Sequence, residues 1–85
     1  MKCDCCGKTK KLFDMFYTQK NGNCQVRLCS ECNELAERIR QDVLAGEREL
    51  YELHLVQWNR RAKDPSPDFP EWNQAFLAEC SKSSL

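Results

Sequence analysis

Polar and apolar residues alternate over 24–28, a pattern of period two that is typical of a half-buried β-strand. The segment 11–18 is rich in aromatic and β-favouring residues and carries apolar side chains on both of its faces. Between the two, 19–23 contains Asn-Gly, the dipeptide that most strongly favours a tight hairpin turn. The pattern therefore predicts a β-hairpin over 11–28.

Residues 30–63 carry a helical pattern without proline. Apolar residues recur at alternating steps of three and four, a coiled-coil-like seam that includes Ile39 and Leu53. Gly46 interrupts the pattern, costs about 1 kcal/mol relative to alanine, and marks where a kink or break would fall. Of these alternatives we expect one continuous helix, about 51 Å long at 1.5 Å per residue. Its second half adds an apolar row that something must cover: Tyr51, Leu55 and Trp58.

Three prolines between 65 and 70 end this helix and predict a turn over 64–70. A second helix is predicted over 69–81, where one apolar stripe contains Phe69, Trp72, Phe76, Leu77 and Cys80. This helix can fold back antiparallel on the uncovered row of the long helix. The order of elements predicts an α+β fold in a single domain over 1–85, with a hairpin, a long helix, a turn and a C-terminal helix.

The chain has 85 residues, of which 41% are hydrophobic, and a domain of this size often needs a cross-link besides its thin core. The sequence has no apolar run of about 18 residues or more, so no membrane span is predicted. The N-terminus lacks the hydrophobic region of a secretory signal. We therefore expect a protein of the reducing cytoplasm, where cysteines bind metal rather than one another.

The seven cysteines at 3, 5, 6, 24, 29, 32 and 80 include two C-x-x-C pairs that are separated by 22 residues. Two such pairs complete a tetrahedron around one zinc ion, with zinc–sulfur distances of about 2.3 Å. We expect the ligands to be Cys3, Cys6, Cys29 and Cys32. Gly7 favours Cys6 over Cys5 as the second ligand, because a residue that tolerates positive φ suits the turn after it.

The remaining cysteines leave two alternative ligand sets open, with Cys5 in place of Cys6 or with Cys24 as a ligand. We expect Cys5 at the surface and Cys24 and Cys80 as small buried residues. A redox dithiol at Cys29 and Cys32 is disfavoured, because no βαβ pattern surrounds it and a second C-x-x-C pair is present.

Four thiolates close the coordination shell of zinc, so a site of this kind is structural rather than catalytic. Its binding free energy, about 10–16 kcal/mol for structural sites in peptides, would be folding free energy. The interpretation is a protein with one structural zinc, no small-molecule substrate and no catalysis.

The first C-x-x-C pair lies in a short turn, called the knuckle, which is followed by the hairpin and by a helix whose first turn carries the second pair. This order resembles a treble-clef zinc finger over residues 3–40. The resemblance implies a fold around one zinc, with 41–63 as a helix extension and 69–81 as the helix that packs back. HNH nucleases share this fold but need histidines at the hairpin and helix, and the only histidine here, His54, is far beyond them. The size and style also resemble small accessory proteins of phages and prophages, which implies the host cytoplasm. The residues that carry the treble-clef resemblance are Cys3, Cys6, Gly7, Asn21, Gly22, Cys29 and Cys32.

Charge is distributed unevenly along a chain whose formal net charge is zero. Residues 1–30 hold six basic and two acidic residues, a net charge of +4, whereas 64–85 hold one basic and four acidic residues, a net charge of −3. Four thiolates with one zinc add a charge of about −2 to the basic third. A nucleic-acid-binding finger is the alternative function, through Lys8, Lys10, Lys11, Lys20 and Arg27.

We expect a protein partner rather than nucleic acid, because the start of the long helix is acidic and the apolar surface exceeds what the hairpin and that helix can cover alone. The protein would act as a regulator, adaptor or inhibitor. A homodimer through the Ile39–Leu53 seam is a further, compatible alternative. Tyrosine and tryptophan are enriched at interface hot spots. The expected contact residues are Phe13, Met15, Tyr17, Tyr51, Leu55 and Trp58.

Overall fold

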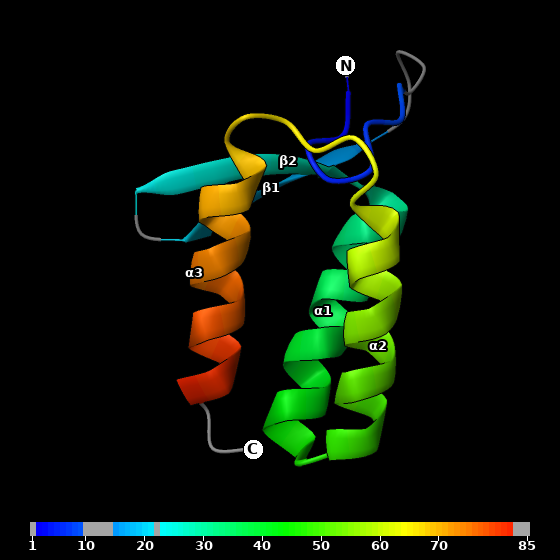
Figure 1. The fold of residues 1–85 in the computed structure, drawn as a ribbon, viewed down its shortest axis with the longest axis vertical. Helices are drawn as coiled ribbons and strands as arrows, with labels where there is room; N and C mark the ends of the chain where they lie inside the picture. The colour runs from blue at the N-terminus through cyan, green and yellow to red at the C-terminus, as the bar shows by residue number, and fades with distance from the viewer. Residues whose placement is uncertain (1, 10–14, 22, 83–85) are drawn as a thin grey trace.

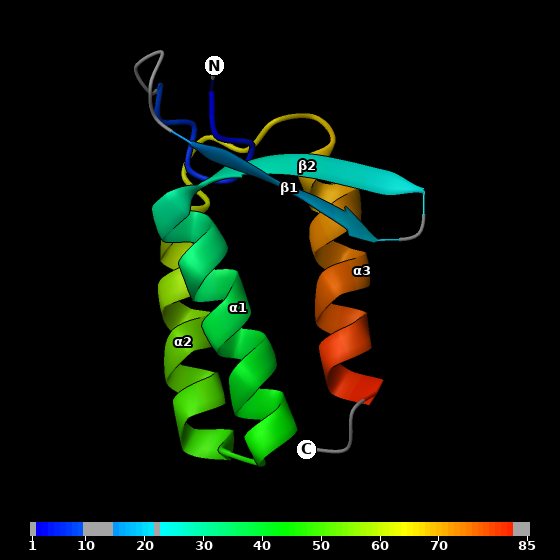
Figure 2. The ribbon, with the colours of Figure 1, turned by 180° about the vertical axis from the view of Figure 1, so that it is seen from behind.

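The computed structural model describes residues 2–9, 15–21 and 23–82, and these form a hairpin beside three helices (Figure 1). The α+β prediction is confirmed. The chain runs down α1, up α2 and down α3, and the hairpin lies across one end of this layer of helices (Figures 1 and 2). The elements in chain order are β1 Phe16–Asn21, β2 Cys24–Cys29, α1 Ser30–Ala45, α2 Arg48–Arg61 and α3 Phe69–Lys82.

The two strands pair antiparallel, with a register that runs from Phe16 opposite Cys29 to Asn21 opposite Cys24. The expected turn over 19–23 is therefore too long, because residues 19–21 belong to β1. Most of the strand expected over 11–18 cannot be compared, since 10–14 lie outside the described residues. Val26 and Leu28 are buried as the alternation of β2 predicts.

The first helix ends at a glycine that adopts a left-handed conformation. Gly46 has a φ of 70°, which glycine tolerates without steric cost. Its N–H donates to the carbonyl of Val43 at 3.2 Å, and the N–H of Glu47 donates to that of Asp42 at 2.9 Å. Paired bonds of this kind satisfy the last carbonyls of a helix, so the chain leaves α1 here.

The expectation of one continuous helix over 30–63 is wrong, because α2 returns alongside α1 (Figure 2). A continuous helix would be about 51 Å long, whereas the longest dimension of the fold is 38 Å. The folded chain buries Ile39 and Val43, which are 0% and 6% exposed. Burial of two such side chains stabilises by about 1.5–3 kcal/mol each, more than the glycine costs.

The reversal also divides the apolar seam that the sequence places along one helix. Ile39 lies in the core, whereas Leu50 and Leu53 on α2 are 44% and 53% exposed. A homodimer through a continuous Ile39–Leu53 seam does not fit this structure, because half of the seam is buried inside one chain.

A polar pair joins the two helices of this reversal. Asp42 on α1 is buried, and its Oδ2 lies 2.5 Å from Nδ1 of His54 on α2. The histidine thus has a packing role, in agreement with its position far from the cysteine motifs.

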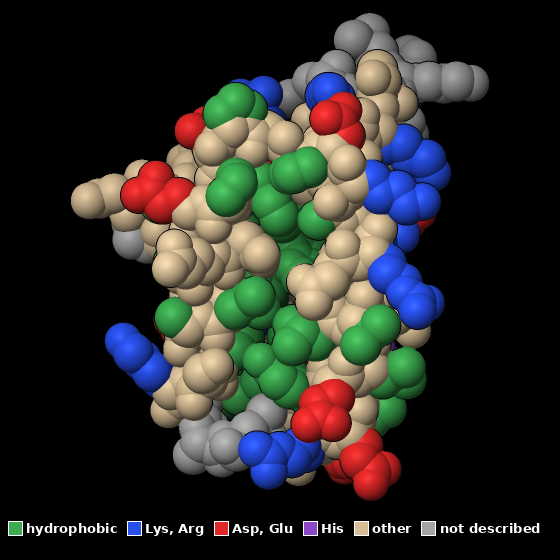
Figure 3. Space-filling model, in the orientation of Figure 1, with side chains coloured by type: hydrophobic (Ala, Val, Ile, Leu, Met, Phe, Trp, Pro, Cys, Tyr) green, Lys and Arg blue, Asp and Glu red, His purple; other side chains and the backbone are tan. Residues whose placement is uncertain are grey.

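An aromatic cluster joins α2 to α3. Trp58 is fully buried, and its ring centroid lies 5.6–6.2 Å from those of Phe69, Trp72 and Phe76. The indole Nε1 of Trp58 donates to Oδ1 of Asn73 at 2.8 Å. Between these two described helices no Cα atoms come within 8 Å, so side chains fill the space that separates them (Figure 3). The predicted C-terminal helix therefore packs back on α2, as its apolar stripe indicates.

Candidate metal centre

The N-terminal knuckle, residues 3–8, is a tight turn that holds Cys3 and Cys6 close together. The N–H of Gly7 donates to the carbonyl of Cys3 at 3.0 Å, and the N–H of Cys3 donates to the carbonyl of Lys8 at 3.0 Å. Gly7 has a φ of 75°, and a Cβ at this position would lie 2.6 Å from Cβ of Asp64. Both the backbone conformation and the close approach of the 64–66 segment therefore require glycine.

Asp4 fixes this knuckle against the hairpin and the turn before α3. Its N–H donates to the carbonyl of Arg27 at 2.8 Å, and its Oδ2 accepts from the N–H of Arg27 at 2.6 Å. Its carbonyl accepts from the N–H of Ser66 at 2.9 Å. One residue thus joins three segments that are far apart in the sequence.

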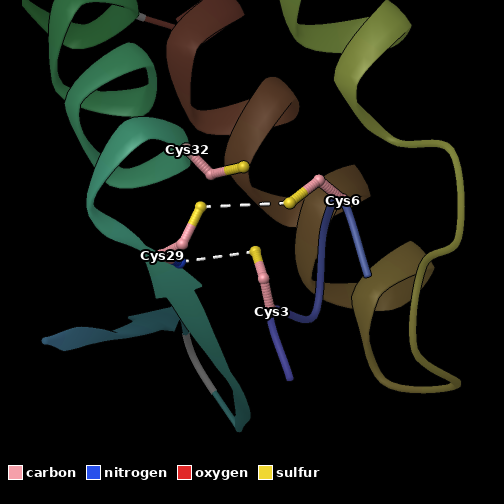
Figure 4. Close-up of side chains that lie close together, drawn as sticks. All are labelled: Cys3, Cys6, Cys29 and Cys32. Atoms are coloured by element: carbon pink, nitrogen blue, oxygen red, sulfur yellow. Dashed lines mark hydrogen bonds between the residues drawn. The ribbon is translucent and has the colours of Figure 1, made fainter. Parts of the chain in front are cut away.

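The fold brings the two C-x-x-C pairs together with four sulfurs facing one another (Figure 4). Cys3 and Cys6 come from the knuckle, Cys29 ends β2, and Cys32 lies in the first turn of α1. Their Sγ atoms all lie within 4.8 Å of one another, and those of Cys6 and Cys29 are 3.9 Å apart. A tetrahedron with zinc–sulfur distances of about 2.3 Å has sulfur–sulfur edges of about 3.8 Å, so the cluster can hold such an ion.

No protein-family model, curated protein or solved structure matches this chain. The candidate metal centre therefore rests on its own geometry and chemistry. No described helix is long and apolar enough to cross a membrane.

Burial and the contacts among the thiols shift the pKa values of the cluster. The neighbouring thiol of Cys32 and burial raise the pKa of Cys3 to about 12, although the backbone N–H groups of Cys29, Cys6 and Cys5 act to lower it. Burial raises the pKa of Cys6 as well. Several thiols in one buried space resist ionisation, and a divalent metal supplies the positive charge that four thiolates require.

Arg61 reaches the centre from the last turn of α2. Its Nε donates to Sγ of Cys32 at 3.2 Å, and its guanidinium lies 3.4 Å from Oε2 of Glu31. The sulfur of Cys32 raises the pKa of Arg61. No local sequence pattern points to this residue, because only the reversal at Gly46 brings the end of α2 to the start of α1.

Replacing Arg61 with methionine is expected to weaken zinc binding by about 10- to 100-fold, because a partner that orients and polarises a ligand sulfur is lost. Competition with a chromophoric chelator measures the affinity. Arg60→Met is the matched control, since Arg60 is exposed and makes no side-chain hydrogen bond within the described residues. Equal affinities for the two variants would contradict the role of Arg61.

The three other cysteines lie outside the four-sulfur cluster. Cys5 is fully buried, so its expected surface position is wrong; its side chain lies inside the fold beside the thiol of Cys32. Cys24 is half-buried and Cys80 is buried. Neither alternative ligand set is the one that the geometry brings together.

The expected partner-contact residues are scattered. Met15 and Tyr17 are 67% and 38% exposed, whereas Phe13 lies outside the described residues. Tyr51 and Leu55 are half-buried against the core. Trp58 is fully buried, because α3 covers it, and it therefore belongs to the core rather than to a contact surface.

The basic residues that the sequence singles out do not form one described patch. Lys8, Lys20 and Arg27 are exposed, while Lys10 and Lys11 lie outside the described residues. Lys8 instead lines a cleft of about 340 Å³ beside Cys6, together with basic residues from the end of α2. Lysine and arginine side chains gather along this edge of α2 in Figure 3. The basic residues of the cleft are Lys8, Arg60, Arg61 and Lys63.

Proposed function

We propose that the protein is a non-catalytic, treble-clef-like zinc protein that acts by binding a protein partner as a regulator, adaptor or inhibitor. The closed four-sulfur cluster of Cys3, Cys6, Cys29 and Cys32 carries the zinc part of the proposal. Zinc bound there would be structural, because four thiolates leave no position for water or substrate.

The open edge of β1 supports the protein partner. Both backbone groups of Arg27 bond to Asp4, so they point away from β1. The residue opposite Arg27 is Thr18, and in an antiparallel pair its N–H and C=O then point away from β2. With a period of two, the backbone groups of Phe16 and Lys20 face the same way.

Nothing in the described part of the chain bonds to this edge. The sheet has two strands there, and β1 passes in front of β2 in Figure 2 without a helix over it. An unpaired strand edge accepts an extended peptide segment through backbone hydrogen bonds, while side-chain contacts give selectivity. The exposed Met15 and Tyr17 would supply such contacts.

Replacing Thr18 with proline tests this mode of binding. Proline removes the outward N–H of residue 18 but leaves the ladder hydrogen bonds between β1 and β2 in place. We expect Thr18→Pro to keep the fold and one zinc and to lose at least about 90% of the partner captured from a lysate. Thr18→Ala is the matched control and should capture the partner like the native protein. Unchanged capture by a folded Thr18→Pro variant would refute strand addition.

Nucleic acid is the second candidate, supported by the basic cleft at Lys8, Arg60, Arg61 and Lys63. Phosphate contacts through such side chains make binding strongly dependent on salt. Capture that disappears after nuclease treatment, together with salt-sensitive binding to plain duplex DNA, would favour this function over the protein partner.

A further inference from the structure

The second helix has an outer face that the fold leaves uncovered. At 100° per residue, Glu49, Leu53, Val56 and Arg60 lie within an arc of about 60°, on the side of α2 opposite the buried Trp58. Leu53 and Val56 are 53% and 48% exposed. In Figure 3 the outer edge of α2 shows acidic side chains at its lower end, apolar ones above them and basic ones higher still.

The charges at the two ends of this face are also unengaged. Among the described residues, Glu49 and Arg60 take part in no ion pair and no side-chain hydrogen bond. Glu49 lies in the first turn of α2 and Arg60 in its last turn. The face therefore carries opposite charges on either side of an apolar centre.

These four positions are symmetric about the middle of the helix. Residues 49 and 60, like residues 53 and 56, are equally distant from the point midway between 54 and 55. A two-fold axis through that point would place a second α2 antiparallel to the first. Glu49 would then face Arg60 of the second copy, and Leu53 would face Val56, with each contact made twice.

We propose that the outer face of α2 binds a second copy of this chain, as an antiparallel helix pair. The charge pattern carries the proposal, since it is complementary to itself only in the antiparallel orientation. The inference goes beyond the proposed function and uses neither β1 nor the zinc ligands.

The expected dimer is weak and reversible. The helix has 14 residues and a length of about 21 Å, so one helix pair buries less than the roughly 1,200 Å² that is typical of stable interfaces. Sedimentation of the zinc-loaded protein should show a monomer at about 10 µM and a growing dimer fraction up to about 1 mM.

Charge reversal gives the decisive test. Glu49→Arg places two arginines together across the helix pair, and Arg60→Glu places two glutamates together, so each variant should dimerise at least about tenfold more weakly. A mixture of the two variants restores opposite-charge contacts between unlike chains and should form a heterodimer more readily than either variant forms a homodimer.

Two further variants complete the experiment. Leu53→Glu should abolish the dimer, whereas Leu44→Glu is the control, since Leu44 is 83% exposed and lies outside α2. Circular dichroism checks that each variant remains folded, because the reversed charges oppose the helix dipole. A native monomer at 1 mM, single variants that dimerise normally, or a mixture without heterodimer would each overturn the proposal.

Discussion

Replacing Cys32 with alanine is expected to abolish the folded state at room temperature. A structural zinc site contributes about 10–16 kcal/mol in peptides, whereas the net stability of a domain is about 5–15 kcal/mol. The variant leaves three ligands around the ion and removes the link between the knuckle and α1. Circular dichroism and the dispersion of amide resonances report the loss of structure, and metal analysis reports the loss of the expected one zinc per chain.

Cys5→Ala is the matched control, because Cys5 and Cys32 are both fully buried and the substitution is the same. We expect this variant to keep one zinc and to lose only about 1–2 kcal/mol of stability, from the buried sulfur alone. Loss of zinc in Cys5→Ala, with zinc retained in Cys32→Ala, would refute the ligand set.

Trp58→Ala is expected to detach α3 and to leave the metal bound. The substitution removes the ring that fills the space between α2 and α3, and large-to-small changes of this kind cost about 3–5 kcal/mol. Thermal unfolding measures the cost. Trp72 is then the only tryptophan, so a red shift of its emission reports the exposure of α3.

Trp58→Phe separates the contribution of aromatic packing to stability from that of the hydrogen bond. Phenylalanine keeps most of the aromatic packing but cannot donate to Asn73, so a loss of about 1–2 kcal/mol is expected. Equal destabilisation by the two variants would contradict the expected contribution of ring packing. Loss of zinc in either variant would contradict the expectation that the metal centre does not depend on the aromatic cluster.

The elements that depend on local patterns could be predicted from the sequence. The alternation over 24–28 predicts β2, the stripe from Phe69 to Cys80 predicts α3, and the two C-x-x-C spacings identify the four clustered cysteines. Within each strand, helix or C-x-x-C pair, the side chains that decide the structure lie within a few turns or residues of one another.

Features that depend on the chain reversal could not be predicted. At Gly46 the local cost of a glycine is compatible with a kink, a break or a continuous helix, and the outcome depends on tertiary contacts between α1 and α2, such as that of Asp42 with His54. The contact of Arg61 with Cys32 and the basic cleft both depend on this reversal, since both need the end of α2 to lie beside the knuckle. The inward position of Cys5 likewise depends on a distant part of the chain, because its thiol lies beside that of Cys32 in α1.

The positions of the ligands have a consequence for synthesis of the chain. Cys3, Cys6, Cys29 and Cys32 all precede the body of α1, so the complete set of four cysteines emerges from the ribosome before α2 and α3 do. Chains grow at about 5–20 residues per second, so a nascent chain that captures zinc has several seconds to close the knuckle on the hairpin. In such a chain the later helices would dock one after the other on a base that is already closed.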